Sequence, residues 1–91
     1  MVVSIIIANV LVGKVLVDQE SLTDILYWKT YPGPLLGFAG ERVEARGYVD
    51  LMTTFGQGKL SRTLNVRYLV VDADTSYFAL VDRKTLNDWE Q

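Results

Sequence analysis

The sequence predicts one mostly β domain of barrel or sandwich type. Short apolar segments recur along the chain, several of them alternate with polar residues, and turn-forming residues separate them. These segments amount to about six short strands with one or two short helices. The 91 residues suffice for a single domain, residues 1–91, and no repeat or linker divides them.

Two strands are expected at the start of the chain. Val2–Ile7 is rich in β-branched residues, which is typical of a strand buried on both faces. Either Ala8-Asn9 or Gly13-Lys14 can turn the chain after it, and the sequence does not decide between the two. Residues 15–17 form the second strand, which ends at Asp18.

A helix is expected next. Ser21 has the side chain of an N-cap, and Asp24 follows at the position from which an acid can reach back to the cap. Three apolar residues then follow with helical spacing: Leu22, Ile25 and Leu26. Pro32 disfavours helical geometry in the residue before it, so the helix should end near Thr30.

The rest of the chain predicts further strands. Residues 43–53 are the clearest case, because small or apolar residues alternate there with polar ones. Gly56-Gln57-Gly58 is typical of a hairpin turn, and residues 64–70 alternate again and form the return strand. Residues 78–81 add a short apolar strand, and residues 85–89 a terminal helical turn.

Composition excludes several classes of function. Nine basic and eleven acidic residues give a net charge of −2, so no basic surface is expected for nucleic acid or anionic lipid. Cysteine and histidine are absent, which excludes disulfides, thiolate nucleophiles, Cys/His zinc sites and Ser-His triads. We expect no metal and no cofactor. The apolar start has no basic leader and falls short of the ~20 residues of a membrane span, so we expect a cytoplasmic protein without membrane contact.

The most distinctive motif is the apolar run Val15-Leu16-Val17, which leads directly into Asp18. A buried strand that ends on an acid is how an aspartic peptidase presents its catalytic carboxylate. Further segments follow in a characteristic order: Asp24-Ile25-Leu26-Tyr27-Trp28, residues 31–38, Gly40-Glu41-Arg42-Val43, residues 46–51, residues 66–71 and residues 76–87. Together these segments resemble the retropepsin-like aspartic peptidase domain of plant (gypsy-type) retrotransposon polyproteins.

The resemblance implies a small closed β-barrel of the acid-protease type, which cleaves peptide or polyprotein substrates as a homodimer. Each subunit contributes one aspartate, here Asp18, to a shared two-fold axis. Two carboxylates about 3 Å apart share one proton, so one can activate a water while the other donates to the scissile carbonyl. The resemblance also assigns an active-site loop of Gln19, Glu20 and Ser21. It assigns a flap of Gly37, Phe38, Ala39 and Gly40. Asp24 and Arg83 are expected to brace the loop as an ion pair.

The chain departs from this family at three places. The family has Thr or Ser and then Gly after the aspartate, where this chain has Gln19 and Glu20. Asp82 occupies a second glycine position, and the connection between Trp28 and Tyr31 is shortened. A side chain at residue 20 would crowd the partner loop, and its charge would add repulsion at the dimer axis.

These departures predict a degenerate copy with impaired or absent activity. Two alternatives remain at the level of sequence. One is a retropepsin-like domain that dimerises or binds peptide without catalysis. The other is an unrelated small β interaction module that adds strands to its edges, in which Asp18 is an ordinary strand-end residue and residues 37–40 an ordinary hairpin turn.

Overall fold

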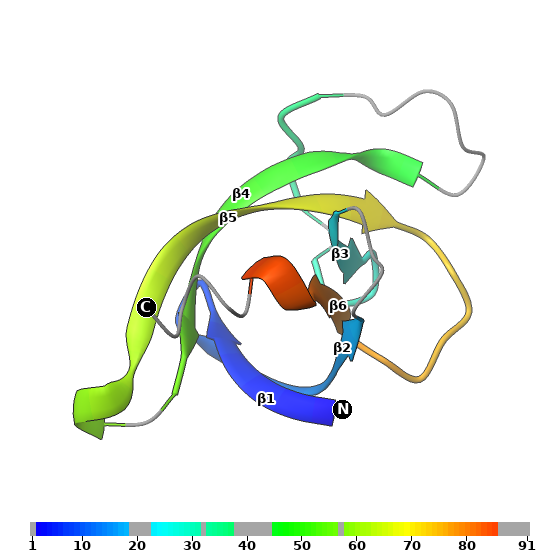
Figure 1. The fold of residues 1–91 in the computed structure, drawn as a ribbon. Helices are drawn as coiled ribbons and strands as arrows, with labels where there is room; N and C mark the ends of the chain where they lie inside the picture. The colour runs from blue at the N-terminus through cyan, green and yellow to red at the C-terminus, as the bar shows by residue number, and fades with distance from the viewer. Residues whose placement is uncertain (1, 19–22, 32, 38–44, 57, 86–91) are drawn as a thin grey trace.

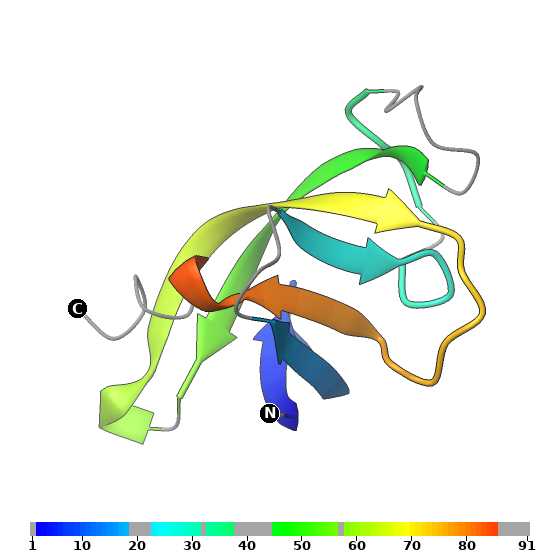
Figure 2. The same ribbon diagram turned by 45° about the vertical axis from the view of Figure 1, so that its right-hand side comes forward.

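Six strands close into a barrel in the computed structural model, which describes residues 2–18, 23–31, 33–37, 45–56 and 58–85 (Figures 1 and 2). Around the barrel the strands follow the order β1-β2-β6-β3-β5-β4. Their bounds are Val2–Ile7 (β1), Val10–Asp18 (β2), Asp24–Tyr27 (β3), Ala45–Phe55 (β4), Arg62–Val71 (β5) and Ala79–Asp82 (β6), with a 3₁₀ turn at Gly58–Leu60 (η1). The predicted mostly β, closed-barrel fold is confirmed.

The first hairpin turns at Ala8 and Asn9, the earlier of the two candidate positions. Both residues have positive φ, 50° and 70°, as a two-residue type I′ turn requires, and Ile7 pairs with Val10 across it. The other candidate, Gly13-Lys14, is instead a bulge within β2. The register passes there from the Ile5–Val12 pair to the Val3–Val15 pair, so two residues of β1 are opposite three residues of β2, and Lys14 has a φ of 52°.

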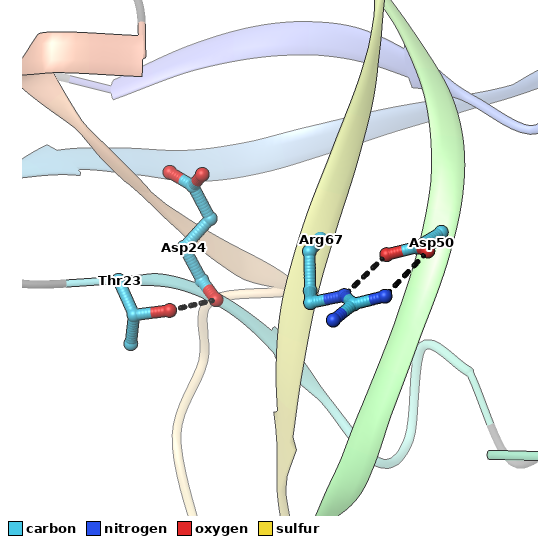
Figure 3. A network of polar contacts seen from close by, with 4 residues as sticks. All are labelled: Thr23, Asp24, Asp50 and Arg67. Atoms are coloured by element: carbon cyan, nitrogen blue, oxygen red, sulfur yellow. Dashed lines mark hydrogen bonds and ion pairs between the residues drawn. The ribbon is translucent and has the colours of Figure 1, made fainter. Parts of the chain in front are cut away.

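Strands β4 and β5 form the long hairpin expected from their alternating pattern. Their register runs without a break from the Gly47–Val70 pair to the turn, where Gly56 has a φ of 95°. Asp50 and Arg67 stand directly opposite each other, and Arg67 donates two hydrogen bonds of 2.8 and 2.9 Å to the carboxylate (Figure 3). These bonds lower the pKa of Asp50. Because both groups are exposed, the pair contributes little to folding stability.

The predicted helix is wrong over its described residues, because residues 24–27 form strand β3. The strand is parallel to β5 and antiparallel to β6. Its burial follows period two, with Asp24 and Leu26 inside the barrel, while Ile25 packs outside against Ala45, Leu69 and Val71. A strand with apolar residues on both faces lacks the alternation of apolar and polar residues that identifies a strand in a sequence. The spacing of the apolar residues here therefore matched that of a helix.

The barrel interior is filled by the inward residues of all six strands. These include Ile5, Val15, Val17, Leu26, Val49, Val70, Ala79 and Val81. Tyr68 is completely buried among them, and its hydroxyl lies 2.9 Å from that of Thr53. Burial raises the pKa of Tyr68. Residues 83–85 are helical, so helical structure begins two residues before the predicted turn at residues 85–89, of which only Thr85 is among the described residues.

Candidate active site

Asp18 is the last residue of β2, and the barrel determines which way it faces. Val15 and Val17 point into the core, whereas Leu16 and Asp18 are partly exposed. This alternation follows from the period of a strand, in which successive side chains point to opposite faces. Asp18 therefore stands at the rim of the barrel, at the end of a strand, and the sequence motif predicts that strand end.

Strand β6 brings a second acid to the same place. β6 runs parallel to β2, with Val17 opposite Val81 and Asp18 opposite Asp82. Both strands show the same burial pattern, so Asp18 and Asp82 share one face at the same end of the sheet. The sequence identified Asp82 as a substitution for glycine, but only the register makes it the immediate neighbour of Asp18.

Asp24 ties the start of β3 to the end of β6. Its Oδ1 accepts a hydrogen bond of 2.8 Å from the backbone N–H of Asp82, and its Oδ2 accepts one of 2.9 Å from the hydroxyl of Thr85. Just before it, the hydroxyl of Thr23 donates to the Asp24 carbonyl at 3.5 Å (Figure 3). The Asp24 carboxylate therefore anchors strand β6 at its last residue, Asp82, which follows the last core residue of that strand.

The pKa of Asp24 reflects this position. Burial raises the pKa of Asp24, because a charged carboxylate loses hydration inside the barrel rim. The hydrogen bonds from Asp82 and Thr85 act in the opposite direction, and the negative charge of Asp82 adds to the increase.

The expected ion pair between Asp24 and Arg83 is absent from the ion pairs of the described residues. The Asp24 carboxylate faces the backbone of Asp82 and the hydroxyl of Thr85, and these two groups occupy both of its oxygens. Sequence reasoning missed Thr85 in this role. No local signal could reveal it, since the two residues are 61 positions apart and meet only when β3 and β6 pair.

The base of the predicted flap lies along β4. Gly37 forms an isolated bridge with Tyr48, and the N–H of Leu36 donates to the Tyr48 carbonyl at 2.6 Å. Gly47 permits this approach, because a Cβ atom there would overlap the carbonyl oxygen of Gly37. The other flap residues, Phe38, Ala39 and Gly40, lie outside the described residues, as do Gln19, Glu20 and Ser21 of the predicted active-site loop.

Two further observations concern the described residues alone. No group of three or more His, Cys, Asp or Glu side chains among them is arranged to hold a metal ion. None of the helices in that part of the chain has the length and apolarity needed to cross a membrane.

Comparison with known proteins bears on this geometry. The structure is similar to that of the EIAV protease complexed with the inhibitor HBY-793, with a TM-score of 0.68 and 20% sequence identity. The similarity covers 97% of this chain and 86% of that chain. This chain has the fold of a retroviral protease. No family model and no curated protein matches the sequence.

Proposed function

We propose that this chain is a retropepsin-type aspartic endopeptidase domain from a retroelement polyprotein, with Asp18 as its acid and with impaired activity. The observation that carries the proposal is the position of Asp18. It ends a buried strand at the rim of a barrel whose fold is that of a retroviral protease. Fold alone does not specify chemistry, so the proposed activity depends on this carboxylate.

The proposed mechanism requires two chains. Each chain contributes one Asp18, and a two-fold axis would bring the second. With one carboxylate ionised and one protonated, the first removes a proton from water while the second donates to the peptide carbonyl. The segment that begins at Gly37 would close over the substrate and exclude water.

Two substitutions account for the impairment. Glu20 stands where the family has glycine in the active-site loop, and in a dimer of the family's kind it would add a side chain and a charge near the axis. Asp82 adds a carboxylate beside Asp18 on the neighbouring strand. A dimer would therefore assemble six acidic side chains, from residues 18, 20 and 82 of both copies, and their mutual repulsion opposes association.

The test is a reversion experiment. The double variant Glu20→Gly with Asp82→Gly should bind a statine-type inhibitor, dimerise in its presence during sedimentation, and cleave a peptide substrate at about pH 4–6, the acidic range in which a carboxylate pair holds one proton. The wild-type chain should show weaker binding and little or no cleavage. Adding Asp18→Asn to the double variant should abolish inhibitor binding and turnover.

Other outcomes would redirect the proposal. A double variant that dimerises but neither binds the inhibitor nor cleaves peptide would contradict the peptidase proposal. It would support the second candidate, a non-catalytic dimerisation or peptide-binding domain. Cleavage that persists after Asp18→Asn would rule out Asp18 as the catalytic acid.

A further inference from the structure

The turn end of the β1–β2 hairpin exposes an unusual amount of apolar surface. Leu11 is 72% exposed, Val10 62%, Met52 54% and Ile6 37%. Ile6 and Leu11 are register partners on neighbouring strands, and the backbone N–H of the turn residue Ala8 donates to the Met52 carbonyl at 2.9 Å. These four exposed residues, Ile6, Val10, Leu11 and Met52, are called the hairpin surface below. The hairpin carries no charge from residue 2 to residue 13.

One edge of this hairpin is open. β2 pairs with β1 between Val10 and Leu16, but with β6 only from Val15 to Asp18. The last backbone contact before that stretch is the N–H of Phe78, which donates to the Lys14 carbonyl at 3.1 Å. Within the part of the chain that the structure describes, residues 10–13 therefore have no strand on their second side. Exposed edges of this kind usually carry charges that prevent pairing, and this one carries none.

The turn geometry shows which main-chain groups are available. A two-residue type I′ turn closes on a hydrogen-bonded pair, here Ile7 with Val10. Opposite residues alternate between hydrogen-bonded and non-hydrogen-bonded pairs, so Ile6 and Leu11 form a non-hydrogen-bonded pair. The N–H and C=O of Leu11 consequently point away from β1, toward the open edge.

Two adjoining apolar hollows lie beside this edge. The first is lined by residues 10–13 together with Thr30 and Phe78. The second shares three of these residues and continues to Tyr31 and Leu51. The far wall is preformed, because the Thr30 hydroxyl donates a 2.9 Å hydrogen bond to the Phe78 carbonyl. The open main-chain groups and the apolar lining together suit an extended, uncharged strand with apolar side chains.

We propose that a second copy of this chain occupies this edge, with the two β2 strands antiparallel about a two-fold axis near Leu11. Residues 10–13, Val-Leu-Val-Gly, are themselves the extended, uncharged, apolar strand that the edge accepts. In this arrangement the N–H of each Leu11 donates to the C=O of the other, which makes the interface self-complementary. Pairing also places the exposed Leu11 side chains of the two copies next to each other, and the absence of charge removes any repulsion.

This interface is separate from the one required for catalysis. Asp18 lies at the opposite end of β2, eight residues beyond Val10, or roughly 25 Å along an extended strand. The inference therefore goes beyond the proposed function and does not depend on it. Each interface can be disrupted without touching the other.

The experiment is sedimentation of the full chain from about 1 µM to about 1 mM, without inhibitor, since small interfaces associate in this range. The wild-type chain should form dimers. Leu11→Lys should lower the association constant about tenfold or more, because pairing would bury an unpaired charge. Leu60→Lys is the matched control, since Leu60 is 86% exposed on η1, and it should leave dimerisation unchanged.

A second variant tests the strand pairing itself. Leu11→Pro removes an N–H that faces the open edge, a position that tolerates proline, so the barrel should remain folded by circular dichroism while dimers are lost. A wild-type chain that stays monomeric throughout this range would overturn the inference. Dimerisation that both Leu11 variants leave intact would overturn it too. A dimer seen only with the statine-type inhibitor, and lost in Asp18→Asn, would support the proposed function and count against this second interface.

Discussion

The carboxylate of Asp24 offers the sharpest test of how the site is held together. It is only 8% exposed and accepts hydrogen bonds from the backbone of Asp82 and the hydroxyl of Thr85. Asp24→Ala would leave both donors without their acceptor, at the point where β6 ends beside Asp18. The result should be a less stable barrel whose damage is concentrated at the rim.

The magnitude follows from the two bonds. A hydrogen bond to a charged group contributes about 1.5–3 kcal/mol net, and the cost of burying the carboxylate offsets part of the sum. We therefore expect Asp24→Ala to lower the free energy of unfolding by about 2–4 kcal/mol near pH 7. In a domain of this size each kcal/mol corresponds to about 4–8 °C, so Tm should fall by at least about 8 °C.

Asp24→Asn is the matched control. The amide oxygen can accept from the Asp82 N–H, and the amide nitrogen can donate to the Thr85 hydroxyl, so both contacts survive without a charge. Burial raises the pKa of Asp24 above its usual value of 3.8, which means that the folded chain binds this proton more tightly than the unfolded chain. The Asp24 contribution to stability therefore decreases as pH rises from 3.8 through the raised pKa, and Asp24→Asn should remove that decrease.

The assay is thermal unfolding followed by far-ultraviolet circular dichroism, from about pH 3 to about pH 8, for the wild type and both variants. Asp24→Asn should match or exceed the wild type at neutral pH, and Asp24→Ala should lie well below both. Equal stability of Asp24→Ala and wild type would refute the role of the two hydrogen bonds. An Asp24→Asn variant as damaged as Asp24→Ala would show that charge, rather than hydrogen bonding, holds β6.

Three further predictions concern other parts of the barrel. Gly47→Ala should lower the free energy of unfolding, measured in urea, by about 1–3 kcal/mol, because its methyl group would displace the Gly37 carbonyl. An unchanged urea midpoint would contradict this close packing. Tyr68→Phe should lower the free energy of unfolding by about 1 kcal/mol, because it removes one buried hydrogen bond while the Thr53 hydroxyl keeps its bond to the Leu51 carbonyl. A loss above about 3 kcal/mol would indicate a wider hydrogen-bond network. Arg67→Gln should raise the carboxyl pKa of Asp50 toward 3.8 in an NMR titration, with no measurable change in Tm.

The sequence by itself determined most of the barrel. The Val2–Ile7 strand, the β4–β5 hairpin and the strand that ends at Asp18 are all present. Two details of these predictions are wrong: the first strand is not buried on both faces, since Ser4 and Ile6 are exposed, and β2 begins at Val10 rather than at residue 15. These elements were accessible because their information is local: β-branched runs, period-two alternation and glycine-containing turns act within a few residues. The position of Asp18 at the end of a strand belongs to the same class of prediction.

Only the tertiary structure decided the rest. Asp24–Tyr27 became a strand because β5 and β6 pair with both of its edges, and those partners lie more than 40 residues away. The β3–β6 pairing placed Thr85 against Asp24, where the sequence suggested an ion pair with Arg83. The β2–β6 pairing placed Asp82 beside Asp18. Strand register is a long-range property, set by which backbones exchange hydrogen bonds, so no local pattern could predict which side chains would meet at the rim.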